Sequence, residues 1–142
     1  MPATIRFNSR VREYAWLSNF HPCQLVDKEG KLWTSVEAAY VAGKTLDPTL
    51  REQIRLAPSG AAAKTIGKTL VIRPDWSRLK VPYMTLLVQQ KFNIPYLADL
   101  LRATNDAVLV ELAPWDSFWG TGPNGNGQNI MGSLLMVVRS RL

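Results

Sequence analysis

Apolar residues recur at different intervals along the chain, and the intervals predict which segments form strands and which form helices. Ile5 and Phe7 alternate with polar neighbours, as they would in a half-buried strand. The segments 24–27 and 31–33 flank the turn sequence 28–30, which ends in glycine and predicts a hairpin. The first third of the chain is therefore expected to be rich in β-structure.

Helical spacing dominates the rest of the chain. The pattern predicts helices over 34–45, 49–56, 61–68, 81–92, 95–102 and 129–139. A further strand is expected over 108–112. Because strands and helices do not alternate regularly, the order predicts an α+β fold in which helices dominate, rather than a doubly wound sheet.

The composition is typical of one domain, spanning residues 1–142. Hydrophobic residues make up 46% of the chain, and no apolar run approaches the roughly 20 residues that cross a bilayer. Residues 1–7 lack the apolar stretch of a signal peptide, so we expect a cytoplasmic protein with no membrane partner. One cysteine, Cys23, excludes an intrachain disulfide, and one histidine, His21, is too few for a His/Cys metal cage. We therefore expect no metal and no cofactor.

The net charge is +6, and its excess is concentrated between residues 51 and 80. The basic residues of this segment are Arg51, Arg55, Lys64, Lys68, Arg73, Arg78 and Lys80. A zone of this kind attracts phosphates or nucleic acid. It is equally consistent with a solvated basic surface.

The predicted helix 34–45 carries an acid and an amine on one face. Glu37 and Lys44 are seven residues apart, close to two helical turns. Glu37 either closes a capping box with Thr34 or acts as a general acid/base or a carboxylate that stabilises a cationic sugar. Lys44 either complements the negative end of the helix dipole or acts as a nucleophile that forms a Schiff base.

A second polar cluster begins at 115–120, where two tryptophans bracket Asp116. The loop that follows is rich in glycine and asparagine but lacks the ending of a Walker or Rossmann motif. Its backbone N–H groups are able to wrap a ligand. Asp116 and Trp119 are therefore candidate site residues. Asn129 either caps the last helix or binds ribose hydroxyls.

Three other residues carry two interpretations each. Trp76 is either a core anchor or a plate on which a base stacks. Arg73, with Arg78 nearby, has the geometry to bind a phosphate bidentately, or it belongs to a solvated surface. Asn19 is a turn residue by default.

Several of these segments, taken in order, resemble the motifs of the NADAR family, the YbiA-like N-glycosidases. The matching segments are 14–20, 35–44, 61–67, 73–76, 91–92, 115–120, 127–129 and 132–139, with Met84 between the fourth and fifth. The resemblance covers nearly the whole chain. It implies a YbiA-like single domain, helix-dominant α+β with a small β-sheet.

The resemblance also implies an activity, the hydrolysis of N-glycosidic bonds in ribose-phosphate compounds. The substrate would be ADP-ribosylated guanine in nucleic acid or a ribosylaminopyrimidine phosphate of the riboflavin pathway, and some members work beside a toxin partner. The family's glutamate and lysine correspond to Glu37, which assists proton transfer as the base departs, and Lys44, which captures the opened sugar as a Schiff base. The other implied site residues are Asp116, with the catalytic pair, and Asn19, Arg73, Trp76, Trp119, Gly120 and Asn129, which shape the sugar and base pocket.

Two positions depart from the family pattern. The usual histidine of the helix motif is Ala38, and the usual glutamine is Val41. Val41 is expected on the helix face that meets substrate, between Glu37 and Lys44. The loss of two polar groups there leaves a second interpretation open, a module that binds ADP-ribose or a nucleotide without cleaving it.

Overall fold

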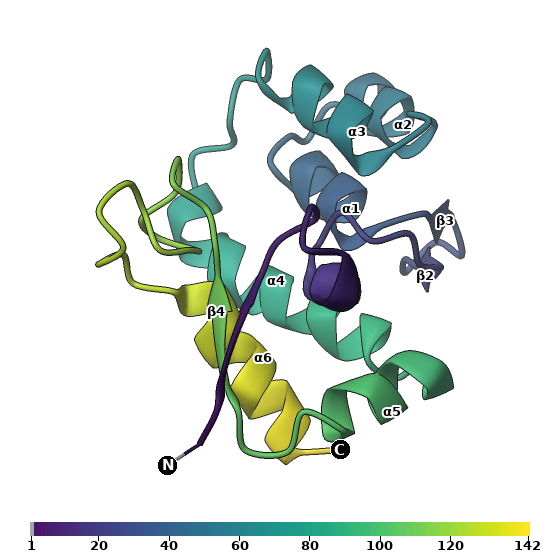
Figure 1. Cartoon of the computed structure of the whole chain (residues 1–142). Coiled ribbons are helices and arrows are strands. Elements are labelled where there is room, and N and C mark those ends of the chain that lie inside the picture. The colour runs from purple at the N-terminus through teal and green to yellow at the C-terminus, as the bar shows by residue number, and fades with distance from the viewer. Residues whose placement is uncertain (1) are drawn as a thin grey trace. The chain divides into compact units, whose positions relative to one another are not determined.

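The computed structural model describes residues 2–142, so Met1, which the single-domain prediction included, lies outside the described residues. Its elements are shown in Figure 1: β1 (Thr4–Phe7), η1 (Arg12–Leu17), β2 (Leu25–Val26), β3 (Leu32–Trp33), α1 (Val36–Gly43), α2 (Pro48–Arg55), α3 (Gly60–Gly67), α4 (Trp76–Lys91), α5 (Pro95–Arg102), β4 (Val108–Glu111) and α6 (Ile130–Ser140). Helices dominate and the strands pair two by two, which confirms the predicted helix-dominant α+β class. No helix in the described part of the chain is both long and apolar enough to cross a membrane.

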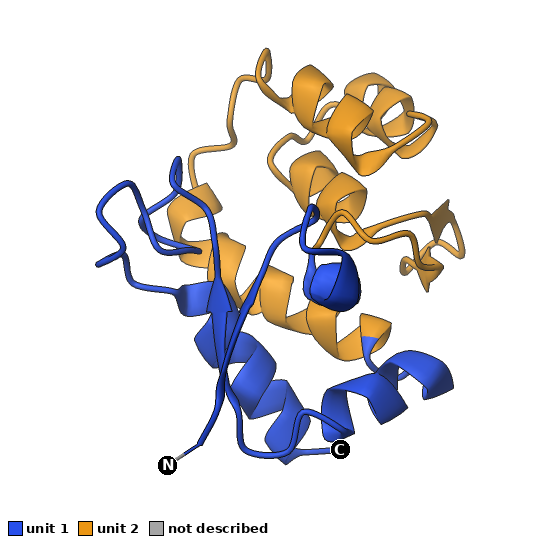
Figure 2. Ribbon diagram, viewed as in Figure 1, with its two compact units in different colours: residues 1–18, 92–142 blue, residues 19–91 orange. Residues whose placement is uncertain are grey.

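The chain divides into two compact units, coloured separately in Figure 2. Unit 1 contains the residues up to Ser18 together with Phe92–Leu142, and unit 2 is Asn19–Lys91. Each unit has its own buried apolar residues. The organisation of the chain as a single domain stays a prediction.

Unit 1 is built on a parallel pair of strands. Thr4 lies opposite Val108 and Phe7 lies opposite Glu111, so β1 and β4 run side by side in the same direction. A parallel pair needs a long connection, and here the connection contains the whole of unit 2. Helix α6 packs against β4, and α5 packs against α6.

Unit 2 is built around helix α1. The antiparallel hairpin β2–β3 precedes this helix, and α2, α3 and α4 pack against it. The sequence of α1, Val-Glu-Ala-Ala-Tyr-Val-Ala-Gly, has a single charged residue and is apolar almost all round. A helix of this composition is stable only when it is covered on most of its sides.

The structure confirms most of the predicted elements to within two residues and corrects two of them. Helix α4 begins at Trp76 rather than at residue 81, and Pro82 lies inside it. The first third contains only short strands, and 12–17 form a 3₁₀ helix, so the β-rich expectation for this part was too strong.

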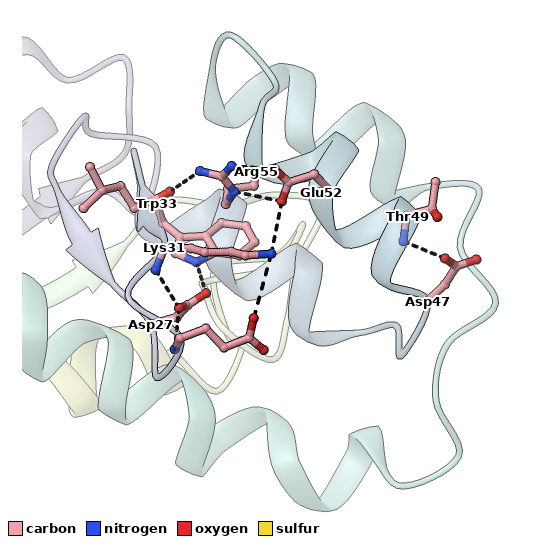
Figure 3. A network of polar contacts seen from close by, with 9 residues as sticks. Asp27, Lys31, Trp33, Asp47, Thr49, Glu52 and Arg55 are labelled. Atoms are coloured by element: carbon pink, nitrogen blue, oxygen red, sulfur yellow. Dashed lines mark hydrogen bonds and ion pairs between the residues drawn. The ribbon is translucent and has the colours of Figure 1, made fainter.

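Asp27 organises the turn of the β2–β3 hairpin (Figure 3). One carboxylate oxygen accepts hydrogen bonds from the N–H groups of Glu29 and Lys31, each 2.9 Å long. The other accepts from the Trp33 indole at 3.0 Å. Partial burial works to raise the pKa of Asp27, but these hydrogen bonds outweigh it and leave the pKa below its ordinary value.

Ion pairs connect the same hairpin to helix α2. Lys31 Nζ lies 3.7 Å from a carboxylate oxygen of Glu52, and the Arg55 guanidinium also binds Glu52. Arg55 donates a further hydrogen bond to the carbonyl of Leu32 at 3.3 Å. These groups are partly exposed, so they add orientation more than stability.

We predict that Asp27→Asn destabilises the fold in a pH-dependent way. Because the pKa of Asp27 is lowered by folding, the carboxylate stabilises the native state above about pH 4, and this contribution is lost as the pH falls through the folded-state value. The variant should lose about 1 kcal/mol of unfolding free energy at pH 7 and approach the wild type below pH 4. Urea unfolding at several pH values measures this. The exposed Asp106→Asn is the control, and a constant difference for Asp27→Asn across pH would contradict the assignment.

Gly43 lets an aromatic ring lie against the end of α1. A Cβ atom at this position would overlap the ring of Tyr83, which comes from α4. The Tyr83 hydroxyl donates a 2.8 Å hydrogen bond to the carbonyl of Ala39 on α1. The absence of a side chain at Gly43 is therefore a condition for the close packing of α1 and α4.

We predict that Gly43→Ala destabilises the protein by about 1–3 kcal/mol, because the new methyl group displaces Tyr83. In an unobstructed helix the same change stabilises by roughly 0.5–1 kcal/mol. Thermal and urea unfolding measure the effect. Repeating Gly43→Ala in a Tyr83→Ala background, where the methyl group has room, should remove the penalty; an equal penalty in both backgrounds would refute the clash.

Candidate active site around helix α1

Helix α1 exposes charge at only two places, Glu37 near its start and Lys44 at its C-cap. Both side chains are half-buried, whereas every other residue from Val36 to Gly43 is buried. An acid and an amine are therefore the only side chains of this segment that reach toward solvent.

The N-cap of α1 is Ser35, so the predicted capping box between Thr34 and Glu37 is wrong. The Ser35 hydroxyl accepts a 3.1 Å hydrogen bond from the N–H of Ala38. A capping box would place its glutamate at 38, where this chain has alanine. The structural explanation that the sequence offered for a carboxylate at 37 therefore no longer applies.

Glu37 lies against the N-terminus of α3. A Cβ atom at Gly60, the first residue of α3, would be 3.4 Å from the Glu37 Cβ and 3.1 Å from the ring of Phe20. The backbone N–H of Glu37 donates a 3.0 Å hydrogen bond to the carbonyl of Asn19. Asn19 itself is buried, with its side-chain amide 3.6 Å from the Met84 sulfur. The predicted residues Asn19 and Glu37 are thus brought together.

Lys44 is held at its backbone from two sides. Its N–H donates to the carbonyl of Val41 at 3.1 Å, and its own carbonyl accepts from the N–H of Arg73 at 2.8 Å. Its amine lies over the ring of Tyr40, 5.4 Å from the centroid. Arg73, predicted near the site, therefore reaches Lys44 through its backbone.

The guanidinium of Arg73 is engaged by a carboxylate in this structure. Its Nε and Nη2 donate to the two oxygens of Asp75 at 2.6 and 3.0 Å. This pairing holds the pKa of Asp75 below its ordinary value. Arg73 thus makes the kind of bidentate contact that was expected for a phosphate, but its partner in this structure is Asp75.

Trp76 lies in the interior of unit 2, as the core interpretation of this residue requires. It is only 8% exposed. Its ring is 5.1 Å from that of Tyr40 and 6.1 Å from that of Tyr83, between centroids. Trp76 therefore packs against the ring of Tyr40 and restricts its position.

The two departures from the family pattern are interior residues. Ala38 and Val41 are each only 2% exposed. Val41 points toward α3, where its methyl group would be 2.6 Å from a Cβ atom on Gly67. The expectation that Val41 lies on the substrate-facing surface is therefore wrong, because α3 covers this part of the helix face.

In unit 1, the carboxylate of Asp116 shapes the loop that contains it. One of its oxygens accepts 2.9 Å hydrogen bonds from the N–H groups of both Phe118 and Trp119, as in an Asx turn. The rings of Phe118 and Trp119 meet edge to face, 5.0 Å apart. Gly120 is buried, and a Cβ atom there would be 2.6 Å from that of Ala113. Asp116, Trp119 and Gly120 are thus brought together.

Asn129 binds the strand β4 with both ends of its side-chain amide. Its Oδ1 accepts from the N–H of Glu111, and its Nδ2 donates to the carbonyl of Leu109, each at 2.9 Å. Asn129 is the N-cap residue of α6, as one interpretation predicted, but it has a left-handed backbone conformation and its side chain makes no cap hydrogen bond. Gly132, one turn into α6, permits the close approach to Leu109.

The candidate residues thus form two groups. Unit 2 contains Asn19, Glu37, Lys44, Arg73 and Trp76, and unit 1 contains Asp116, Trp119, Gly120 and Asn129. Sequence reasoning missed Tyr40, although its spacing of four residues from Lys44 places the two side chains on one helix face. Within residues 2–142, no cluster of three or more His, Cys, Asp or Glu residues is suited to a metal ion.

We predict that Asn129→Ala destabilises the protein by about 1–3 kcal/mol, because it leaves one backbone donor and one backbone acceptor of β4 without their side-chain partner. Asn126→Ala, in the exposed part of the same loop, is the matched control and should change stability by less than about 0.5 kcal/mol. Urea unfolding compares the two. A ligand-only role for Asn129 would leave the unfolding free energy unchanged.

Comparison with known proteins places the chain in a family. The NADAR domain model matches residues 6–142. The N-glycosidase YbiA of Escherichia coli is 36% identical over 141 residues, covering 97% of this chain and 88% of that protein. The solution structure of E. coli YbiA superposes with a TM-score of 0.86 at 35% identity, covering 99% of this chain and 86% of that one.

A second relative is much longer than this chain. The riboflavin biosynthesis protein VVA0006 of Vibrio vulnificus is 36% identical over 146 residues, which is all of this chain but only 39% of that protein. These comparisons relate the chain, with its acid and amine on a largely buried helix, to a known family. The chain belongs to the NADAR domain family, and the predicted membership and YbiA-like fold are confirmed.

Proposed function

We propose that this chain is an N-glycosidase that hydrolyses the N-glycosidic bond of an ADP-ribosyl or ribosyl-phosphate substrate. The observation that carries the proposal is the pattern of α1, which is buried everywhere except at Glu37 and Lys44. The name N-glycosidase, borne by a relative that matches nearly the whole chain, supports the enzyme class.

In the proposed reaction the two side chains have separate roles. Glu37 supplies the proton taken up by the departing base, whose nitrogen keeps the electron pair of the broken C1–N bond. The Lys44 amine attacks C1 as the C1–N bond breaks. The C1–O4 bond of the sugar ring then breaks, and the ring oxygen takes a proton from the amine, which gives the Schiff base. Water then adds to C1, and the amine is released with the sugar as an aldehyde. The family resemblance implies roles in binding the sugar and the base for Asp116, Trp119 and Asn129 of unit 1, and these roles stay predictions.

Two substrate classes fit this chemistry. The Vibrio relative is named for riboflavin biosynthesis, which supports a ribosylaminopyrimidine phosphate. The basic segment 51–80 supports a phosphate-bearing substrate of either class, including ADP-ribosylated guanine in nucleic acid. Part of its charge is neutralised locally, because Arg55 pairs with Glu52 and Arg73 pairs with Asp75.

The alternative is a module that binds ADP-ribose or a nucleotide without cleaving it, with or without a toxin partner. Ala38 and Val41 motivate it, because they replace polar residues of the family motif. Their burial favours the enzyme instead, since the replacements change the packing of α1 and leave the two exposed charges in place.

We predict that Lys44→Ala abolishes product release while the protein stays folded, because the nucleophile is removed. Glu37→Gln keeps the size of the side chain and should lower turnover by roughly 10²–10⁴-fold. The panel contains ADP-ribosylated guanine DNA, a ribosylaminopyrimidine phosphate and NAD, with products identified by mass spectrometry. Lys28→Ala, which removes an exposed lysine from the turn between β2 and β3, is the control and should retain activity.

The same panel separates the two interpretations. Undiminished release by Lys44→Ala would refute the proposed mechanism. Absence of release from every substrate by folded wild type, together with tight binding of ADP-ribose in calorimetry, would establish the binding module instead.

A further inference from the structure

The amine of Lys44 lies over an aromatic ring of its own helix. Nζ is 5.4 Å from the centroid of the Tyr40 ring, within the roughly 6 Å range of a cation–π contact. Tyr40 precedes Lys44 by one turn and is only 7% exposed. The buried Tyr40 ring therefore provides a fixed surface against which the half-buried Lys44 amine packs.

The Tyr40 ring is fixed by a closed set of contacts between α1 and α4. Trp76 packs against Tyr40, and Tyr83 packs edge to face against Trp76. The Tyr83 hydroxyl returns to α1 by donating to the carbonyl of Ala39 at 2.8 Å. Burial raises the pKa of Tyr83, so this hydroxyl stays a donor at neutral pH.

The other end of Lys44 is fixed as well. Its carbonyl accepts from Arg73 at 2.8 Å, and its N–H donates to Val41 at 3.1 Å. A lysine side chain loses rotamer entropy when it is ordered. A nucleophile that is ordered before substrate binds does not pay that cost during the reaction.

We propose that Tyr40 is a positioning residue for Lys44: its ring, backed by Trp76 and Tyr83, holds the amine where it attacks the sugar C1. The attack on C1 in this inference rests on the proposed function. The placement of the amine over the Tyr40 ring does not depend on that function. Unit 2 contains a second contact of the same kind, Lys64 over Phe20 at 5.6 Å, which serves as an internal reference.

Placement is measured by reductive ¹³C-methylation of the lysines, followed by NMR. Dimethyl-lysine keeps its positive charge, and methyl groups above a ring face resonate upfield of exposed ones. The Lys44 signal, assigned by its loss in Lys44→Arg, should lie upfield of that of Lys68. Tyr40→Phe should retain this shift and Tyr40→Leu should abolish it. Phe20→Leu should move the Lys64 signal and leave that of Lys44 in place.

Reactivity is measured with ribose 5-phosphate and cyanoborohydride. The amine and the C1 aldehyde condense with loss of water, and hydride from the reagent reduces the imine to a stable secondary amine. Peptide mass spectrometry should locate the adduct at Lys44. The rate should fall about tenfold in Tyr40→Leu, recover in Tyr40→Phe, and stay at the wild-type value in Tyr96→Leu, which removes an exposed tyrosine of α5.

The outcomes separate this inference from the proposed function. An unshifted Lys44 signal in wild type, or equal trapping rates in Tyr40→Leu and wild type, would overturn the role of Tyr40. Ring-dependent trapping at Lys44 without turnover of any substrate in the panel would uphold the role of Tyr40 and refute the glycosidase proposal.

Discussion

The burial of helix α1 is the constraint on which the rest of unit 2 depends. An eight-residue helix has little stability of its own, so it forms because α2, α3 and α4 cover it. Glycines at the contacts let the neighbouring helices approach closely: Gly67 of α3 lies against Val41, and Gly43 of α1 lies against Tyr83. Charge is compatible with such a helix only where the covering is incomplete, and it occurs there as Glu37 and Lys44.

The same constraint explains how the chain can depart from the family motif at two positions beside Glu37 and Lys44. Ala38 and Val41 face covering elements, so an apolar residue at either site satisfies the packing of the interior. Glu37 and Lys44 are the half-buried positions of this segment, where packing does not fix the residue type. Substitution at the first two positions therefore leaves the proposed acid and nucleophile unchanged.

Unit 1 illustrates a different use of polar side chains. Asp116 and Asn129 have the residue types of a ligand site, yet both bind backbone in this structure. Asp116 accepts from two successive N–H groups and shapes its loop, and Asn129 joins the start of α6 to β4. Buried or half-buried backbone groups need partners, and a short polar side chain supplies them when no strand or helix does. These hydrogen bonds hold the loop in its conformation.

The sequence by itself determined the class of the fold, the positions of most helices, and the family. These features follow from local periodicity and from ordered motifs, both of which can be read along the chain. Only the tertiary structure decided that Ser35 caps α1, that α3 covers Val41, that Trp76 backs Tyr40 and that Asn129 binds β4. The Ser35 cap is a local hydrogen bond to Ala38, and the sequence offered both Thr34 and Ser35 for it. The other three features depend on which residues from distant parts of the sequence come into contact, and periodicity gives the direction of a side chain without giving its neighbour.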